Sequence, residues 1–353
     1  MRRYEAKDRN SIAEPVHVLH VTESLGAGVE SAIRAYVEAT PEIRHHLLAA
    51  RRGGAHDDQT ADVFESRSVL SRSVRGYGQI REQMALLQPT VVHLHSSWAG
   101  FLGGFPLPRG PRIVYSPHCF SFNRRDVNSV ARKSFLAVEK VLRTRRDVLA
   151  ACSAHEAEIA ERMGFSRVVI VPNVASIKSE PSTDFALAPK RRLVMAGRIG
   201  VQKAPEYFAD VYRDLRRADP SWVATWIGDG DTLLRRGLEA AGIEVTGWQK
   251  PEGVAERLRD GGVFLHSARW EGYPVAVIDA VNSGLPVLTR RIACFRDSWD
   301  FSSAESPQGL SKMAQRLAAS REYAVENVRG WRRVLALNTV AEQRRSLMDC
   351  YGS

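Results

Sequence analysis

Two acidic residues bracket a short apolar run in the stretch WEGYPVAVIDAVNSGLPVL. Glu271 precedes the run and Asp279 closes it, although a buried carboxylate is costly unless a partner satisfies it. A proline at the start and a glycine after the end predict a helix over residues 274–283, following a strand. Glu271 would then precede the helix N-terminus, where Gly272 exposes backbone N–H groups that favour an anion. The segment could therefore bind phosphate through N–H groups and hydroxyl groups through its two carboxylates.

A pair of cations follows another expected strand, in the stretch LVMAGRIGVQKAPEYF. Gly197 ends this strand, and Arg198 and Lys203 come directly after it. Arginine binds phosphate oxygens bidentately, and lysine acts beside them as a point charge. Because ligands of open parallel sheets bind at the carboxyl ends of strands, we predict that this pair binds a diphosphate.

The sequence GDGD at residues 228–231 has two interpretations. Two acids in this spacing can bind Mg²⁺ or Mn²⁺ beside phosphates, but glycines after the apolar run WVATWI are also typical of a turn. We favour the turn, because Arg198 and Lys203 could already neutralise a diphosphate. We therefore expect neither a metal ion nor a cofactor.

A glycine-rich loop, TESLGAGVE, follows the first apolar run. Gly26 and Gly28 would let a ligand approach the free N–H groups of the next helix; the alternative is an ordinary turn. The loop does not fit a dinucleotide fingerprint, because Ser31 takes the third glycine position and residues 22–25 separate the glycines from the strand.

Short apolar runs alternate with helical patterns along the whole chain, as in parallel sheets that helices cover on both faces. The first half contains expected strands at 16–21, 45–50, 90–96, 112–118, 147–153 and 167–173. We predict an α/β fold of two Rossmann-like, doubly wound domains that face a cleft. The expected division is a flexible tail at 1–14, a first domain at 15–176, a linker at 177–190, a second domain at 191–330 and a C-terminal helical segment at 331–353, which can return to the first domain.

Several of these stretches resemble, in family order, the motifs of retaining glycosyltransferases of family 4. WEGYPVAVIDAVNSGLPV resembles the E-x7-E signature, AGRIGVQKAPEYF the Gly-Arg…Lys phosphate motif, and WIGDGDTLL the Gly-x-Gly turn. TESLGAGVE resembles the first glycine loop, YSPHCFSF the T-P-H-G stretch, and VVIVPNVAS the P-N-G strand end. The matches extend from about residue 16 to residue 290. The resemblance implies the two-domain GT-B fold, in which the first domain binds the acceptor and the second binds the nucleotide sugar.

The resemblance also implies a role for each residue of the expected cleft. Arg198 and Lys203 bind the donor diphosphate and stabilise it as the leaving group. Glu271 holds hydroxyl groups of the transferred sugar, and Asp279 accepts a hydrogen bond from the ribose. The other implied site residues are His118 beside the reacting sugar and the donor-binding Gly26, Gly28, Gly197, Gly272, Tyr273, Pro274 and Val275. The family retains the anomeric configuration and uses no metal ion.

Four positions depart from the family pattern. Asp279 stands where glutamate is usual and is one methylene shorter, which can weaken or shift its contact with a ribose. Cys119 and Val174 stand where glycines are usual, and Ala204 follows the phosphate-motif lysine where glycine is common. None of these changes removes a charged group, so we expect an active enzyme.

Two further histidines, His93 and His95, face one side of an expected strand in VVHLHSSW. They could bind a metal ion, but no third ligand is apparent, and we assign them to packing or to polar contacts on the acceptor side. The four cysteines form no CxxC pair, which favours free thiols in a reducing cytoplasm.

The net charge of +10 is unevenly distributed: residues 101–150 hold ten Lys or Arg against three acids. Such a region is either a solvated helix face or a surface for anionic partners. Basic residues alternate with apolar ones over residues 124–146, which predicts peripheral association with an anionic membrane. Nucleic acid is not an expected partner, because no recognition motif is present. The charged start of the chain does not resemble a signal peptide.

The sequence thus predicts a cytoplasmic glycosyltransferase of the hexosyltransferase type, which moves a sugar from a nucleotide diphosphate sugar to a glycan or lipid-linked acceptor in polysaccharide or glycolipid biosynthesis. Two alternatives remain open: a sugar-nucleotide epimerase of the same fold, and a non-catalytic carbohydrate-binding relic. The motifs do not specify the donor nucleotide, the sugar, the acceptor or the linkage.

Overall fold

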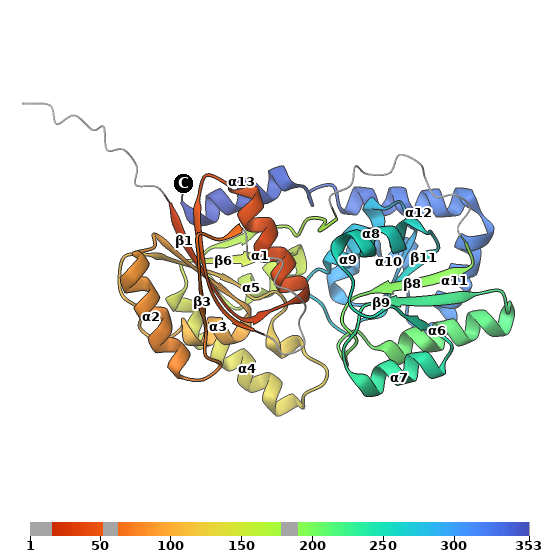
Figure 1. The fold of residues 1–353 in the computed structure, drawn as a ribbon, viewed down its shortest axis with the longest axis horizontal. Helices are drawn as coiled ribbons and strands as arrows, with labels where there is room; N and C mark the ends of the chain where they lie inside the picture. The colour runs from red at the N-terminus through yellow and green to blue at the C-terminus, as the bar shows by residue number, and fades with distance from the viewer. Residues whose placement is uncertain (1–15, 52–62, 178–189, 353) are drawn as a thin grey trace, which may run out of the picture.

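The computed structural model of the chain describes residues 16–51, 63–177 and 190–352. The predicted tail at 1–14 lies outside the described residues, and so does the predicted linker at 177–190 apart from its first and last residues. The described residues form two lobes that lie side by side (Figure 1).

The first lobe is built on a seven-stranded parallel sheet in the order β3-β2-β1-β4-β5-β6-β7. Its strands are β1 (His17–Leu25), β2 (Arg44–Arg51), β3 (Ser66–Val69), β4 (Val91–His95), β5 (Arg112–Ser116), β6 (Val148–Ala151) and β7 (Val168–Ile170). Its helices are α1 (Ala27–Ala39), α2 (Arg75–Leu87), α3 (Ser96–Leu102), α4 (Ser129–Leu142) and α5 (Ala154–Arg162). Central strands such as β4 and β6 are buried along their whole length, which explains their nearly continuous apolar sequences.

The second lobe repeats this plan with a six-stranded parallel sheet in the order β10-β9-β8-β11-β12-β13. Its strands are β8 (Arg192–Ala196), β9 (Val223–Ile227), β10 (Glu244–Val245), β11 (Val263–His266), β12 (Val287–Arg290) and β13 (Ser303–Ala304). Its helices are α6 (Pro205–Ala218), α7 (Thr232–Ala240), α8 (Pro251–Arg259), α9 (Val275–Asn282), α10 (Trp299–Ser302), α11 (Pro307–Ala319) and α12 (Arg321–Val334). In each sheet the first strand of the lobe pairs with the second on one side and the fourth on the other. This is the point where a doubly wound sheet binds its ligand, so β1–β4 and β8–β11 locate the expected site.

The predicted fold class of two doubly wound α/β lobes is therefore confirmed. Two edge strands, β3 and β13, were not predicted, because they are short and partly polar (SRSV and SA). The first strand is also longer than predicted: β1 continues to Leu25, with an irregular register after Thr22. Gly26 therefore follows the strand directly, and the spacing argument against a dinucleotide fingerprint was wrong on this point.

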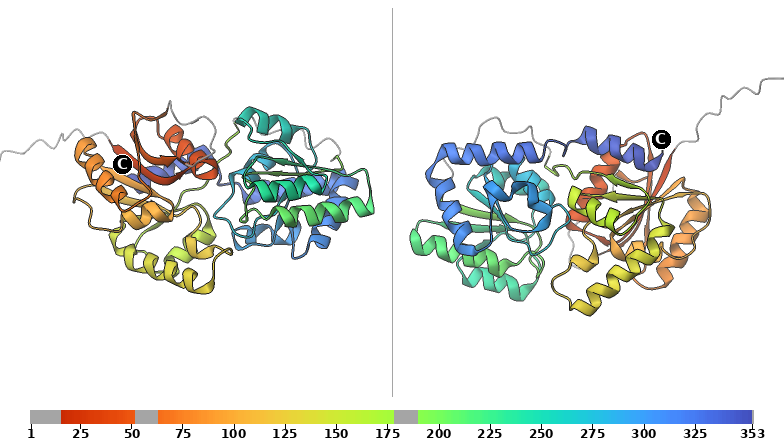
Figure 2. Two further views of the ribbon diagram at one scale, coloured as in Figure 1. Left: turned by 60° about the horizontal axis from the view of Figure 1, so that its bottom comes forward. Right: turned by 180° about the vertical axis from the view of Figure 1, so that it is seen from behind.

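The last helix, α13 (Val340–Tyr351), packs on the first lobe although it follows α12 of the second. Leu347 and Cys350 are fully buried in the first lobe's core, and the Tyr351 hydroxyl lies 3.0 Å from His93 Nδ1 on β4. The two last helices consequently extend along one side of both lobes (Figure 2). Within the described residues, every helix is too short or too polar to span a bilayer.

The packing of α13 predicts that two leucine substitutions differ strongly in how far they lower the free energy of unfolding. Leu347→Ala should lower the free energy of unfolding by about 2–5 kcal/mol, because it leaves a cavity between α13 and the first sheet. Leu337→Ala is the control, since this side chain is 67% exposed in the preceding turn. Equal stabilities of the two variants in chemical denaturation would contradict the packing of α13 on the first lobe.

Candidate active site

A cleft of about 1420 Å³ lies between the two lobes, at the carboxyl ends of strands from both sheets. Residues of the first glycine loop and of the turn after β5 line one wall, and loops after β8, β9 and β11 line the other. The fold brings all of the predicted site residues to this cleft: Gly26, Gly28, His118, Gly197, Arg198, Lys203, Glu271, Gly272, Tyr273, Pro274, Val275 and Asp279. The crevice is large enough for a donor and an acceptor together, since pockets for single small ligands measure roughly 300–1,000 Å³.

The polar centre of the second lobe's wall is an ion pair between Lys203 and Glu271. Lys203 Nζ lies 2.6 Å from Glu271 Oε1, and the two side chains are only 18% and 10% exposed. His266, at the end of β11, places its Nε2 3.5 Å from the same oxygen. Burial alone would raise the pKa of Glu271, but the Lys203 ammonium, with a smaller contribution from the nearby His266, lowers it to about 2. Glu271 is therefore an anion at neutral pH. His266 was not predicted, although its place at a strand end was visible in the sequence.

Arg198 lies in the same wall but is exposed. No carboxylate in the described part of the chain forms an ion pair with its guanidinium. The wall thus holds one neutralised cation and one uncompensated cation, which is the charge distribution that an incoming diphosphate would complement.

The Arg198 loop is held by the glycines of the GDGD turn. A Cβ on Gly228 would lie 2.4 Å from the Gly197 carbonyl oxygen, and a Cβ on Gly230 would lie 2.1 Å from the Ile199 carbonyl oxygen. Both contacts are too close for any side chain, so only glycine lets the two loops meet. Backbone bonds complete the junction, from Ile199 N to Asp229 O and from Asp231 N to Ile199 O.

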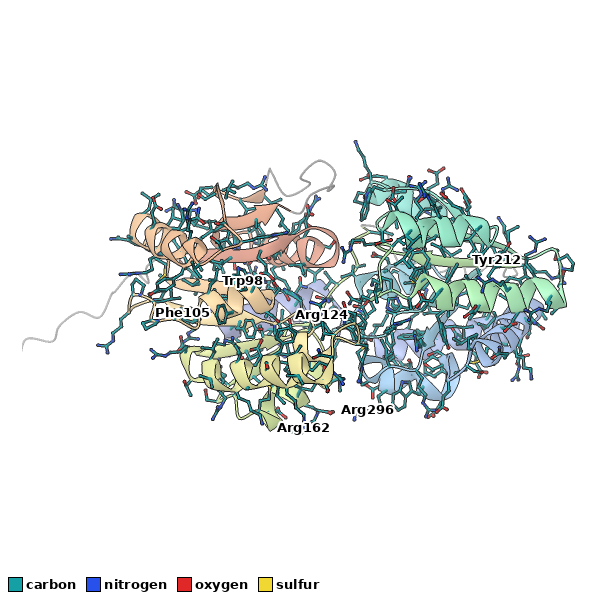
Figure 3. The ribbon with its side chains drawn as sticks, turned by 90° about the horizontal axis from the view of Figure 1, so that it is seen from below. Trp98, Phe105, Arg124, Arg162, Tyr212 and Arg296 are labelled. Atoms are coloured by element: carbon teal, nitrogen blue, oxygen red, sulfur yellow. The ribbon has the colours of Figure 1, made fainter. Side chains whose placement is uncertain are left out.

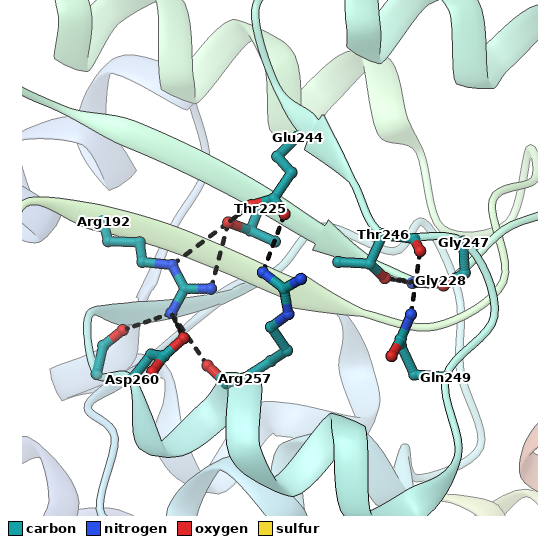
Figure 4. Close-up of polar contacts among 10 residues, drawn as sticks. Arg192, Thr225, Gly228, Glu244, Thr246, Gly247, Gln249, Arg257 and Asp260 are labelled. Atoms are coloured by element: carbon teal, nitrogen blue, oxygen red, sulfur yellow. Dashed lines mark hydrogen bonds and ion pairs between the residues drawn. The ribbon is translucent and has the colours of Figure 1, made fainter.

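The acids of the turn also have structural partners. Asp229 pairs with Arg235 at 2.7 Å, and Asp231 caps α7 by accepting the N–H groups of Leu233 and Leu234. On the far side of the turn, the Gly228 N–H donates to the Thr246 hydroxyl (Figure 4). These contacts are those expected of a turn that supports the wall.

Close contact between the lobes depends on Gly272. A Cβ at this position would lie 2.8 Å from Cys152 Sγ and 3.0 Å from the Cys119 backbone nitrogen, both in the first lobe. Asn173 adds a hydrogen bond from its side-chain amide to the Tyr273 carbonyl oxygen, at 2.7 Å. The N-terminus of α9 is therefore held directly against the turn that carries His118.

Asp279 lies on α9 as predicted, but its carboxylate is already engaged. Its Oδ1 accepts the backbone N–H groups of Ser176 and Ile177, at 2.7 and 3.1 Å, and its Oδ2 accepts the Ser176 hydroxyl at 2.6 Å. Burial raises the pKa of Asp279 to about 6, against these hydrogen bonds, which lower it. Asp279 thus fastens the segment that crosses between the lobes, and a ribose hydroxyl would have to share its oxygens. Sequence reasoning did not identify Ser176 as its partner.

The turn that carries His118 has an unusual backbone. His118 and Cys119 have φ angles of 50° and 92°, in the region that favours glycine. Glu156 stabilises this turn, because its carboxylate accepts the N–H groups of Cys119 and Cys152 at 2.8 and 2.9 Å. Ala204 also has a positive φ, of 49°. Two of the positions that differ from the family's glycines therefore keep a glycine-like backbone, whereas Val174 does not.

A cluster of buried histidines lies behind His118 in the first sheet. His20, His93 and His95 bring ring nitrogens within 4.8 Å of one another, a grouping that could hold a metal ion. The third candidate, His20, was not predicted, although it alternates with other polar positions along β1. In the structure both ring nitrogens of each histidine lie within hydrogen-bond distance of a protein group, so a metal ion would have to replace existing hydrogen bonds.

Comparisons with known proteins agree with this geometry. Residues 27–177 match the family model described as Glycosyltransferase Family 4, and residues 190–318 match the model described as Glycosyl transferases group 1. An uncharacterised 41.2 kDa protein in the cps region of Klebsiella pneumoniae is 24% identical over 79% of this chain and 82% of its own length. An Escherichia coli UDP-Gal:α-D-GlcNAc-diphosphoundecaprenol α-1,3-galactosyltransferase is 27% identical over 57% of this chain and 58% of its own length.

Solved structures resemble the whole chain. Sucrose-phosphate synthase from Thermosynechococcus elongatus superposes with a TM-score of 0.76 at 15% identity, covering 96% of this chain and 98% of its own. The Anabaena protein HepE, crystallised with UDP-glucose, has a TM-score of 0.72 at 10% identity, covering 94% and 98%.

Two parallel-sheet lobes that face a common cleft define the GT-B architecture. The chain is a glycosyltransferase, with a first lobe that matches the family 4 model and a second that matches the group 1 model.

The backbone at Cys119 predicts an inverted preference between glycine and alanine. Cys119→Gly should be more stable than Cys119→Ala by about 1 kcal/mol, because glycine adopts a positive φ without steric cost. At Val174, which lacks a positive φ, the control pair should rank in the opposite order, with glycine less stable by about 0.5–1 kcal/mol. Chemical denaturation measures all four variants, and the same order at both positions would contradict the strained turn.

Proposed function

We propose that the chain is a retaining, metal-independent glycosyltransferase that uses a nucleotide diphosphate sugar as its donor. The observation that carries this proposal is the arrangement of Arg198 and the Lys203–Glu271 pair at the carboxyl ends of two adjacent strands, β8 and β11. The UDP-glucose complex of HepE supports a nucleotide-sugar donor. The structural partners of Asp229 and Asp231 support a turn rather than a metal site.

In this proposal, Arg198 and Lys203 neutralise the diphosphate as it leaves. The bond between the anomeric carbon and the phosphate oxygen breaks, and the acceptor oxygen bonds to the same carbon on the same face. The departing phosphate oxygen takes the acceptor's proton. Positioned cations stabilise negative charge that develops on the leaving group, which is the largest kind of catalytic contribution. Glu271 holds hydroxyl groups of the sugar. Asp279 already accepts hydrogen bonds from Ser176 and Ile177, and it contacts the ribose through its remaining oxygen lone pairs.

The proposed acceptor is a glycan or a lipid-linked saccharide of polysaccharide or glycolipid biosynthesis. One relative is encoded in a cps region, and the Escherichia coli relative acts on a diphosphoundecaprenol-linked sugar. The acceptor would enter along the first lobe's wall, where Gly26, directly before α1, and Gly28, in the first turn of α1, line the cleft.

We propose further that residues 124–146 bind an anionic membrane surface from the cytoplasmic side. Arg124 lies where the first lobe approaches the second (Figure 3). On α4 the exposed face combines cations, Lys133 and Lys140, with apolar residues, Val130 and Val141, each 71% exposed. A surface that mixes cations with apolar side chains suits the boundary between lipid headgroups and acyl chains.

The diphosphate role predicts a severe defect in Lys203→Ala. Transfer of a labelled sugar should fall about 10²–10³-fold, because the leaving group loses a positioned charge. Lys312→Ala, an exposed substitution on α11 outside the cleft, should retain the activity of the wild type. The donor is first chosen from UDP-, GDP- and ADP-sugars by the rise in melting temperature that binding produces. Unchanged turnover in Lys203→Ala would remove the proposed role.

The same assay separates the two alternatives. A rearranged nucleotide sugar without a lengthened acceptor would identify an epimerase. Binding of a nucleotide sugar with neither transfer nor hydrolysis would identify a non-catalytic relic.

The membrane proposal predicts salt-sensitive binding to anionic vesicles. The wild type should co-sediment with phosphatidylglycerol-containing vesicles at low salt. A triple substitution of Lys133, Lys140 and Arg145 by glutamine should weaken binding by roughly 1 kcal/mol for each charge removed.

The control is the replacement of three exposed arginines on α6, Arg213, Arg216 and Arg217, by glutamine. This variant has the same net charge as the α4 triple variant, but it should bind vesicles as the wild type does. Equal weakening of both triple variants, or no binding of the wild type at low salt, would contradict a specific α4 surface.

A further inference from the structure

Four histidines of the first lobe form a continuous hydrogen-bonded chain that ends at the cleft. His45 Nδ1 lies 2.9 Å from His20 Nε2, and His20 Nδ1 lies 2.9 Å from His95 Nε2. His95 Nδ1 in turn lies 3.0 Å from His118 Nε2. The first three rings are almost completely buried on neighbouring strands β2, β1 and β4, whereas His118 lines the cleft. We call these four residues the histidine chain.

At the buried end of the histidine chain, the direction of hydrogen-bond donation is fixed by Thr40. The Thr40 hydroxyl donates its only hydrogen to the Tyr36 carbonyl oxygen, at 2.8 Å. His45 Nε2 lies 3.0 Å from that hydroxyl oxygen and 3.2 Å from the Thr40 carbonyl oxygen. A carbonyl oxygen can only accept, and the hydroxyl oxygen has no second hydrogen to give. The hydrogen on His45 is therefore on Nε2.

This direction passes from ring to ring, because a neutral imidazole has one N–H and one acceptor nitrogen. With its hydrogen on Nε2, His45 must accept at Nδ1 from His20 Nε2. His20 then accepts at Nδ1 from His95 Nε2, and His95 accepts at Nδ1 from His118 Nε2. Burial lowers the pKa of His45 and of His118 to about 4 and those of His20 and His95 well below the ordinary value, so all four rings are neutral near pH 7.

We propose that the histidine chain holds His118 in the tautomer protonated at Nε2, so that Nδ1 is a hydrogen-bond acceptor for a hydroxyl group in the cleft. Nδ1 has no partner among the described residues. An acceptor nitrogen repels a phosphate oxygen and attracts a hydroxyl group, so His118 selects a hydroxyl of a bound sugar. His20, His45 and His95 are positioning residues, which act through His118. The ligand part of the proposal rests on the glycosyltransferase function proposed above, whereas the tautomer does not.

Nitrogen-15 NMR of the ligand-free, histidine-labelled protein at pH 7.5 measures the tautomer directly. Long-range proton–nitrogen correlations distinguish Nδ1–H from Nε2–H, and the signals of His118 are those missing from the spectrum of His118→Ala. The expected result is Nε2–H at His118. An Nδ1–H tautomer would overturn the proposal, whether or not the protein transfers sugar. A stoichiometric metal ion in the purified protein would also overturn it, because a metal ion would replace hydrogens of the histidine chain.

Two substitutions of His45, at the buried end of the histidine chain, distinguish a change in hydrogen-bond direction from a loss of folding. Glutamine can accept from His20 and donate to Thr40 as His45 does, so His45→Gln should keep the His118 tautomer. His45→Leu removes both functions, and the other rings are then free to reverse. This variant should show a mixture of His118 tautomers, together with a fall in kcat/KM of about tenfold, the scale expected when a buried hydrogen bond is lost.

The matched controls are His46→Gln and His46→Leu, on the same strand. His46 is equally buried, but it bonds to Ser66 outside the histidine chain. Neither control should change the His118 tautomer. A His45→Leu protein that keeps a single Nε2–H tautomer at His118 would show that the direction has another source and would overturn the proposal.

A protein that has the expected tautomer but transfers no sugar would refute the proposed function and leave the assignment of the histidine chain intact.

Discussion

The ion pair between Lys203 and Glu271 is the interaction on which the arrangement of the second lobe's wall depends. Two largely buried charges are costly unless they face each other at hydrogen-bond distance, and these two meet at 2.6 Å. The pair needs β8 and β11 as neighbours, because Lys203 follows one strand and Glu271 the other. The strand order reverses between β8 and β11, which is where a doubly wound sheet forms the crevice that binds its ligand. The sheet topology therefore determines where the charges of the site lie.

The opposite wall is positioned by the same segment. Gly272 directly follows Glu271 and is in contact with the turn of His118, because no side chain separates it from Cys119 and Cys152. Glu156 holds that turn from the first lobe's side by accepting two backbone hydrogen bonds. Gly272 and Glu156 thus hold the charged centre of one lobe close to the neutral histidine of the other. Asp279 adds a further constraint, since it binds the start of the segment that connects the lobes.

Much of this arrangement could be predicted from the sequence, because it depends on local signals. The apolar runs identified the central strands, and a proline and a glycine located α9 within about one residue of its observed ends. Lys203 and Glu271 could be placed in one cleft because both follow strands, and parallel strands have their carboxyl ends at one edge of a sheet. The direct bond between them was not predicted.

The features that were missed depend on contacts between distant segments. The histidine chain requires the register of β1 against β2 and β4, which no local pattern determines. Ser176 and Asp279 are 103 residues apart in the sequence, and Tyr351 reaches His93 only because α13 returns to the first lobe. The end of β1 was misplaced because its last residues, TESL, lack an apolar pattern, although the backbone there still pairs with β2.

A crystal structure of the protein with the nucleoside diphosphate of its donor would show whether the two cations bind the diphosphate. We expect Arg198 and Lys203 both to contact oxygens of the terminal phosphate, with Lys203 still beside Glu271 and the phosphate against the N-terminus of α9. A diphosphate bound elsewhere, or bound in the cleft without either cation, would contradict this expectation.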